Sequence, residues 1–341
     1  MTAEKILAGL GGWAALALLG LAVWVESTPV PVVRLLRRGG DAPQQLPEDY
    51  PERVEKVRCI KDLTYPSQER RNQFDLYLPR TADGPCPVVL WIHGGAFVAG
   101  DKAGIAGWAT YLASEGVAVA AMNYQWAPEA AWPAQVIQVG ECCRCLGRAA
   151  KRYGLDIARL MLAGDSAGAH IAAQFALAQT SPAFTDASGL GPVLGPGTLR
   201  GLLLYCGPYD VRMMGRPKDR KMRFFMSRVG WSCFGRRRWR DTLGARVSAI
   251  GDFVTEDFPP VYLTDGNAWS FEPQGRALVR ILEERGVPIS SRFFPKEEGE
   301  VLHGYQANLA ERNAQVCYAD TLAFLRRRGM LPQVNGTMEN R

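Results

Sequence analysis

The sequence predicts an α/β protein built on a mostly parallel sheet with helices on both faces. Short apolar, β-rich runs alternate with longer helical patterns from about residue 57 to residue 328. Of the 341 residues, 47% are hydrophobic, which is enough for a large buried core. Alternating strands and helices favour parallel pairing, and ligands then bind where the carboxyl ends of the strands meet.

Eight strands are expected. Residues 57–65 and 72–78 alternate polar and apolar side chains, which is typical of an antiparallel edge pair. The other six strands are short apolar runs, at residues 87–92, 117–122, 160–163, 202–206, 261–264 and 290–294. The helical patterns between and after them cover residues 107–115, 135–153, 167–178, 275–285 and 306–328.

Four regions divide the chain. We expect an N-terminal membrane anchor at 1–27, a proline-rich and charged linker at 28–55, an α/β body at 56–330 and a tail at 331–341. Residues 211–257 lie between two predicted strands and are too long for a plain connection. We interpret them as a helical lid inserted over the ends of the strands.

The predicted anchor is an uncharged run of 20 residues at 6–25, ILAGLGGWAALALLGLAVWV. As a helix it would be about 30 Å long, enough to cross a bilayer core. A cleaved signal peptide is the alternative, but no small-residue cleavage site follows the run. Arg34, Arg37 and Arg38 outweigh Lys5 across the run, so the positive-inside bias places the body in the cytoplasm.

Composition excludes several other classes of function. The net charge of +6 is concentrated near the predicted anchor and at residues 218–240, and no zinc-finger, basic-zipper or RNA-recognition pattern is present, so we expect no nucleic-acid partner. Cys142, Cys143 and Cys145 lack partners at metal-ligand spacing and are expected to be reduced thiols. The sequence predicts neither a metal site nor a cofactor.

The pentapeptide GDSAG at 164–168 follows a predicted strand and opens a predicted helix. Small residues on both sides of Ser166 permit the sharp turn that raises a nucleophilic hydroxyl above a sheet. The amide of Ala167 and the start of the helix would then face the group under attack.

A second motif, HGGAF at 93–97, follows the strand at 87–92. Glycine lets backbone N–H groups approach a ligand oxygen closely. Gly94 and Gly95, together with Ala167, are therefore predicted to donate to an oxyanion.

Only three histidines are present, so the general base can be found by counting. His93 belongs to the glycine turn, and His170 lies four residues after Ser166 on a helix that descends from it. His303, in LHGY after the last predicted strand, follows the nucleophile in the chain order that a serine hydrolase needs. We expect it to take the proton from Ser166 and to pass it to the leaving group.

These motifs, with NYQWAPEAAWPAQ at 123–135, resemble the hormone-sensitive-lipase-like carboxylesterase branch of the α/β-hydrolase fold, over residues 58–328. The resemblance implies Ser166 as nucleophile, His303 as base, and Gly94, Gly95 and Ala167 as oxyanion donors. SAGAH at 166–170 is also similar to kynurenine formamidases and prenylcysteine methylesterases.

The position of the acid departs from that family. Its members carry an aspartate a few residues past the strand that matches 261–264, and alignment puts Trp269 there. Glu272 is our first candidate for the acid, because cholinesterase-like relatives use a glutamate in this loop. Asp265 at the end of the strand is the second candidate, Asp210 is the third, and a triad without an acid is the remaining possibility.

The sequence thus predicts a membrane-anchored serine hydrolase that cleaves small carboxylic esters, with a hydrophobic acyl group, through an acyl-enzyme. An amide hydrolase of formamidase type would use the same residues. A binding protein without catalysis, like the plant hormone receptors that resemble this family, is the alternative from another class.

Overall fold

A computed structural model describes residues 19–39, 44–215 and 219–333. Its centre is one eight-stranded sheet with the order β1-β2-β4-β3-β5-β6-β7-β8. The edge strand β1 and its neighbour β2 run antiparallel to each other, β2 runs antiparallel to β4, and the pairs from β4 to β8 are parallel. The mostly parallel sheet and the antiparallel edge pair are therefore as predicted.

Each predicted strand is present. The strands are β1 (Val57–Thr64), β2 (Gln73–Pro79), β3 (Cys86–Ile92), β4 (Ala118–Met122), β5 (Leu155–Asp165), β6 (Leu199–Tyr205), β7 (Val261–Asp265) and β8 (Ile289–Phe293). The central strands are buried along their whole length because helices cover both faces.

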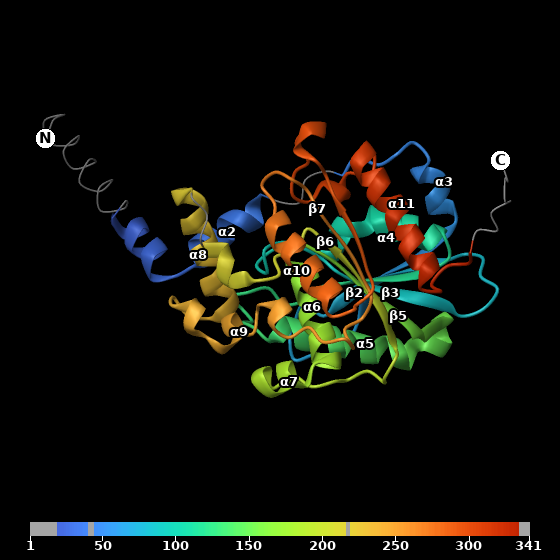
Figure 1. The fold of residues 1–341 in the computed structure, drawn as a ribbon, viewed down its shortest axis with the longest axis horizontal. Helices are drawn as coiled ribbons and strands as arrows, with labels where there is room; N and C mark the ends of the chain where they lie inside the picture. The colour runs from blue at the N-terminus through green and yellow to red at the C-terminus, as the bar shows by residue number, and fades with distance from the viewer. Residues whose placement is uncertain (1–18, 40–43, 216–218, 334–341) are drawn as a thin grey trace, which may run out of the picture.

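Helices form the two outer layers (Figure 1). One face of the sheet packs against α4 (Ala106–Ser114) and α11 (Arg312–Arg327), and the other against α5 (Ala134–Tyr153), α6 (Ala167–Thr180) and α10 (Glu272–Glu284). The short helix α7 (Pro182–Ser188), which the sequence pattern did not predict, follows α6.

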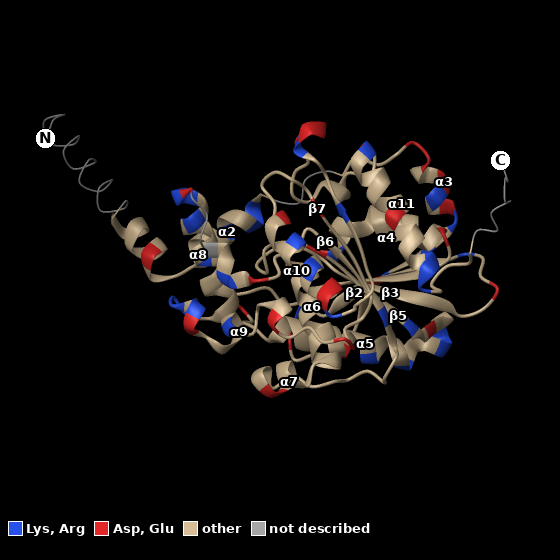
Figure 2. Cartoon of the chain, in the orientation of Figure 1, with Lys and Arg blue, Asp and Glu red and all other residues tan. Residues whose placement is uncertain are grey.

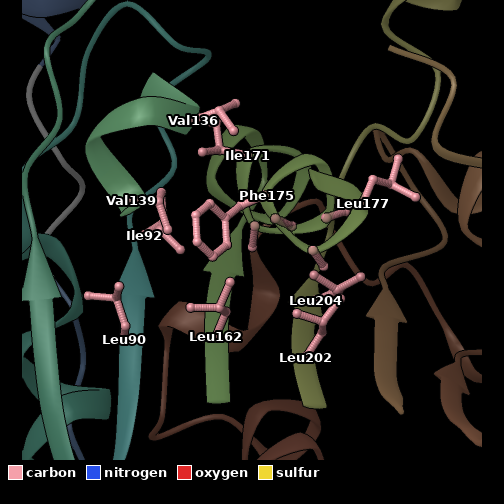
Figure 3. Packing of buried hydrophobic residues seen from close by; sticks show 14 of the residues in the cluster. Leu90, Ile92, Val136, Val139, Leu162, Ile171, Phe175, Leu177, Leu202 and Leu204 are labelled. Carbon is pink, nitrogen blue, oxygen red and sulfur yellow. The ribbon is translucent and has the colours of Figure 1, made fainter. Parts of the chain in front are cut away.

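Alternate residues of each strand enter opposite cores. Figure 3 shows Leu90, Leu162 and Leu202 on one face of the sheet, packed with Phe175 of α6 and Val139 of α5. Their neighbours along the strands belong to the other core, beneath α4 and α11. The parallel pairing from β4 to β8 brings the carboxyl ends of these strands, and the loops that follow them, to one edge of the sheet.

The segment predicted as a linker is not one in the described residues. Residues 28–55 contain α2 (Val30–Arg38) and α3 (Tyr50–Glu55). In α2, Val33 is buried, and Arg37 donates to both carboxylate oxygens of Glu129 and to the carbonyl oxygen of Val98. Two of the prolines that suggested a linker, Pro31 and Pro51, stand in the first turns of these helices, where proline is tolerated.

Residues 211–257 form a helical insertion between β6 and β7, as the length of the segment predicted. It contains α8 (Arg220–Phe234), α9 (Leu243–Arg246) and the 3-10 helices η2 (Val211–Gly215), η3 (Trp239–Asp241) and η4 (Ile250–Asp252). The other 3-10 helices are η1 (Lys102–Ile105), η5 (Lys296–Glu298) and η6 (Tyr305–Ala307). Figure 1 shows α8 beside α2, at the end of the molecule that carries the N-terminal helix.

The predicted membrane span at 6–25 lies mostly outside the described residues. Within the described residues, no single helix is long and apolar enough to cross a bilayer. One helix pair, Leu19–Ser27 with Val30–Arg38, meets the requirements of length and composition only when the two are taken together, and it bends by 96°.

Candidate active site

Ser166 stands at the turn between β5 and α6, with backbone angles φ 51° and ψ −117°. A positive φ is rare for a residue with a side chain, and such strain is maintained only where the surroundings fix it. Gly168 is one part of those surroundings, because a Cβ atom there would lie 2.0 Å from the carbonyl oxygen of Ile92. The close approach of α6 to β3 thus requires the glycine of the motif and holds the Ser166 turn above the sheet.

The His303 imidazole reaches Ser166 from the loop after β8. Its Nε2 lies 3.0 Å from the Ser166 Oγ, which is hydrogen-bond distance. Burial lowers the pKa of His303 to about 4, so the ring is neutral at neutral pH and able to accept a proton. The structure therefore brings together the two residues that chain order predicted.

Asp265, the last residue of β7, lies behind the histidine. Its Oδ1 is 3.9 Å from the His303 Nδ1, and that nitrogen has no hydrogen-bond partner among the residues described. The carboxylate is buried and accepts hydrogen bonds from the amides of Gly266, at 2.8 Å, and Phe271, at 2.9 Å. These two amides fix the carboxylate in place behind the imidazole.

Burial raises the pKa of Asp265 to about 7, while the hydrogen bonds from the Cys206 thiol and the two amides oppose that rise. The group therefore changes charge close to neutral pH. A carboxyl with a raised pKa next to a histidine in a cleft is typical of functional sites.

Our first candidate for the acid, Glu272, is not brought to His303. It begins α10, and its Oε1 accepts a hydrogen bond at 2.7 Å from the Nε of Arg276, one helical turn later. The extra methylene of glutamate does not compensate, because the first turn of α10 directs this carboxylate to the arginine on its own helix. Our third candidate, Asp210, is likewise engaged elsewhere, by both Nε and Nη2 of Arg212.

Trp269, which occupies the expected position of the acid, lies on the wall of the pocket at Ser166. It has a positive φ of 52°, and its side chain is 78% exposed. The loop around it is held to the histidine loop by Asn267, whose Oδ1 accepts from the Val301 amide, and by the His303 amide, which donates to the carbonyl oxygen of Ala268. These hydrogen bonds tie the two loops together, and the carboxylate nearest to His303 Nδ1 is that of Asp265 at the end of β7.

The predicted oxyanion donors need one correction. The Gly94 amide donates to the Oδ2 of Asp165 at 3.0 Å, so it is not available to a substrate. Gly95 and Ala167 line the pocket at Ser166, as does Ala96, and the amides of these three have no acceptor among the described residues. Ala96 has φ 53°, a backbone conformation that the glycine pattern HGGAF did not reveal.

An apolar pocket of about 480 Å³ opens at Ser166 and His303. The insertion contributes four apolar side chains to its wall, those of Met214, Met222, Phe225 and Met226. Leu36 of α2 adds to the wall, so a segment predicted as a linker contributes to the site. No motif identifies these residues, because their place depends on how α2 and α8 pack together.

The other two histidines are structural. His93 is buried and stacks on the ring of Tyr124, with its Nδ1 2.6 Å from the Gly94 carbonyl oxygen. His170 is buried, with its Nδ1 2.8 Å from the carbonyl oxygen of Pro208. Burial lowers the pKa of each to about 4, so both rings are neutral and hold the backbone around the site.

Cys206 completes the buried cluster. In the described part of the chain, its sulfur, a carboxylate oxygen of Asp265 and a ring nitrogen of His303 lie within 4.8 Å of one another. The one thiol hydrogen can be donated either to Asp265 or to Gln306 Oε1, which lies 3.2 Å from the sulfur, and the sulfur accepts from the Gly304 amide at 3.4 Å. Burial raises the pKa of the Cys206 thiol well above its usual value, so the sulfur is protonated at neutral pH.

Comparison with known proteins places this site in context. A sequence model of the BD-FAE family matches residues 74–273. Isoprenylcysteine alpha-carbonyl methylesterase ICME of Arabidopsis thaliana is 35% identical over 121 residues, which are 36% of this chain and 28% of that protein. Esterase LipQ of Mycobacterium tuberculosis is 26% identical over 236 residues, 67% of this chain and 54% of that protein.

Among solved structures, esterase B from Lactobacillus Rhamnosis has a TM-score of 0.72 at 22% identity, with 95% of each chain covered. This likeness shows the fold. The match to the plant methylesterases spans only 24–30% of their length.

Proposed function

Because the chain belongs to the BD-FAE family of α/β-hydrolases, we propose that it is a serine hydrolase that cleaves carboxylic esters. The observation that carries the proposal is the 3.0 Å contact between His303 Nε2 and Ser166 Oγ at the mouth of an apolar pocket. The methylesterase and esterase names of the relatives support the same class of reaction.

In the proposed reaction, Ser166 Oγ attacks the ester carbonyl carbon while the neutral His303 takes the hydroxyl proton on Nε2. The amides of Gly95, Ala96 and Ala167 bind the oxyanion that forms. The tetrahedral intermediate collapses, the C–O bond of the ester breaks, and His303 gives its proton to the departing alcohol.

A water molecule then repeats the sequence on the acyl-enzyme and releases a carboxylic acid. Asp265 stabilises the imidazolium that forms in both steps, across the 3.9 Å gap to Nδ1. The methionine and phenylalanine side chains of the insertion favour an ester with an apolar acyl group, and we propose that this insertion, 211–257, acts as a lid.

We further propose that residues 6–25 anchor the protein in a membrane with a single span and that the body, 56–330, is cytoplasmic. The uncharged length of this run supports the anchor. The basic flank at Arg34, Arg37 and Arg38 supports the orientation, although the charge of Arg37 is paired with Glu129.

The test is labelling of the full-length chain with a fluorophosphonate, followed by intact mass measurement beside a Ser166→Ala control. We expect rapid addition of a single label that the control does not show. Hydrolysis of short p-nitrophenyl esters should be lost in the same control. A folded wild-type sample that takes no label would contradict the proposal and favour a binding protein without catalysis.

A further inference from the structure

A second pocket, of about 670 Å³, lies between the N-terminal helix and the insertion. We call it the arginine pocket. Its charged lining residues are Glu26, Arg220, Arg223, Arg228, Arg237 and Arg238. Five guanidinium groups therefore face a single carboxylate, and the pocket carries a strong local excess of positive charge.

Arg228 is a buried, incompletely hydrogen-bonded arginine in this pocket. It is only 5% exposed, and its Nε has no hydrogen-bond partner in the described part of the chain. Its Nη2 lies 3.0 Å from the Oε2 of Glu26, and its guanidinium carbon lies 4.6 Å from the centre of the Phe224 ring. A buried charge is costly unless it is paired and fully hydrogen-bonded.

Glu26 does not balance the pocket. The oxygen that contacts Arg228 also accepts from Arg237 Nη2 at 2.9 Å, so two arginines share one carboxylate oxygen. An arginine presents several N–H donors in a planar fork that matches two oxygens of a phosphate or carboxylate group. The unused donors therefore fit an oxyanion from outside the chain.

The place of the pocket indicates which oxyanion this is. Glu26 directly follows the uncharged run at 6–25, and in the described helix Leu19–Ser27 the side chains of Leu19, Leu21 and Val23 are exposed. Phe224, on the rim of the pocket, is 39% exposed. Figure 2 shows basic segments on α8 beside this helix. An apolar helix that ends at a basic pocket matches the hydrocarbon and headgroup layers of a bilayer.

We propose that the arginine pocket binds the phosphate group of an anionic membrane lipid. The lipid would be held by the Arg228 fork, with Arg223, Arg237 and Arg238 supplying further charge at the rim. The inference goes beyond ester hydrolysis and rests on the membrane location proposed above. Because α8 also lines the Ser166 pocket through Met222 and Phe225, a bound lipid would hold the insertion at the membrane surface.

The test is native mass spectrometry of the full-length chain released from an uncharged detergent. The probes are dioctanoyl phosphatidylglycerol, dioctanoyl phosphatidylcholine and inorganic phosphate. We expect saturable binding of one phosphatidylglycerol per chain, at least about tenfold tighter than either of the other probes. Equal binding of phosphatidylcholine would contradict recognition of the anion, and equal binding of inorganic phosphate would contradict a lipid as its source.

The test variant combines Arg223→Gln, Arg237→Gln and Arg238→Gln, and leaves the buried Arg228 in place so that the fold is preserved. A charge near a membrane surface contributes roughly fivefold in affinity, so the three changes together should weaken phosphatidylglycerol binding about a hundredfold.

The matched control removes three exposed basic residues of the same insertion that do not line the pocket, as Lys221→Gln, Arg236→Gln and Arg246→Gln. Both variants lose the same net charge, and the control should bind within about twofold of the wild type. An equal loss in the two variants would show a diffuse charge effect and would overturn the proposal. Fluorophosphonate labelling of each variant reports the proposed hydrolase separately and shows that the variant has folded.

Discussion

Replacing Asp265 by asparagine should remove most of the proposed activity. Asparagine keeps the size of the side chain but removes the charge that faces His303 Nδ1 at 3.9 Å. At an effective dielectric constant of about 20, an ion pair at this distance is worth about 4 kcal/mol, which corresponds to roughly a thousandfold in rate. We therefore expect kcat/KM to fall about a thousandfold.

The matched control is Glu272→Gln, which removes a carboxylate seven residues away in the same segment. This carboxylate pairs with the half-exposed Arg276 across one helical turn, and such pairs contribute about 0.3–0.5 kcal/mol. The control should therefore stay within about threefold of the wild type.

The assay is hydrolysis of p-nitrophenyl butyrate at several substrate concentrations, together with the rate of fluorophosphonate labelling. Thermal unfolding of each variant shows whether the fold is intact. A folded Glu272→Gln variant that loses more activity than Asp265→Asn would refute the assignment of the acid to the end of β7.

Three further predictions follow from the described residues. Burial raises the pKa of Asp265 from 3.8 to about 7, so the wild type should lose roughly 3 kcal/mol of stability relative to Asp265→Asn between pH 4 and pH 7 in urea unfolding. Its kcat/KM should rise as Asp265 ionises through pH 7. Parallel stability curves for the two proteins would contradict this reasoning. Lys102→Met should lower the free energy of unfolding by about 3–5 kcal/mol in the same assay, because Lys102 Nζ lies 2.6 Å from the buried carboxylate of Asp75 and 2.9 Å from that of Asp62. A loss below about 1 kcal/mol would show that these ion pairs are dispensable for stability. Gly94→Ala should lower kcat/KM at least about a hundredfold, because the added Cβ would lie 2.4 Å from Asp165 Oδ2. The control Gly147→Ala adds a Cβ in open space and should leave kcat/KM unchanged. Equal kcat/KM values for the two variants would mean that the glycine turn at Gly94 tolerates a side chain.

The sequence alone determined the fold class, the strands and the two central residues of the site. Strand and helix patterns are local, and hydrophobic periodicity records which face of each element is buried. Ser166 could be identified because a sharp strand-to-helix turn needs small neighbours, and the fit of α6 against β3 is the reason. His303 could be identified because only three histidines are present and just one follows the last strand.

Tertiary structure alone decided which acid faces the histidine. Asp265 and Glu272 both lie in the segment that follows Leu263, and the resemblance to cholinesterase-like relatives, which use a glutamate in this loop, favoured Glu272. The choice depends on the path of the loop, which places Trp269 on the pocket wall at a positive φ and ties Asp265 to the amides of Gly266 and Phe271. No local pattern contains this information, because the loop is held by contacts with the distant histidine loop.

The same limit applies to the walls of the site. The side chain of Asp165 binds the Gly94 amide, so the glycine pattern alone assigned one oxyanion donor to the wrong residue. Leu36 and Met226 line one pocket although 190 positions separate them in the chain. Chemistry that depends on residue type and chain order can be predicted from sequence, whereas contacts between distant segments exist only once the chain has packed.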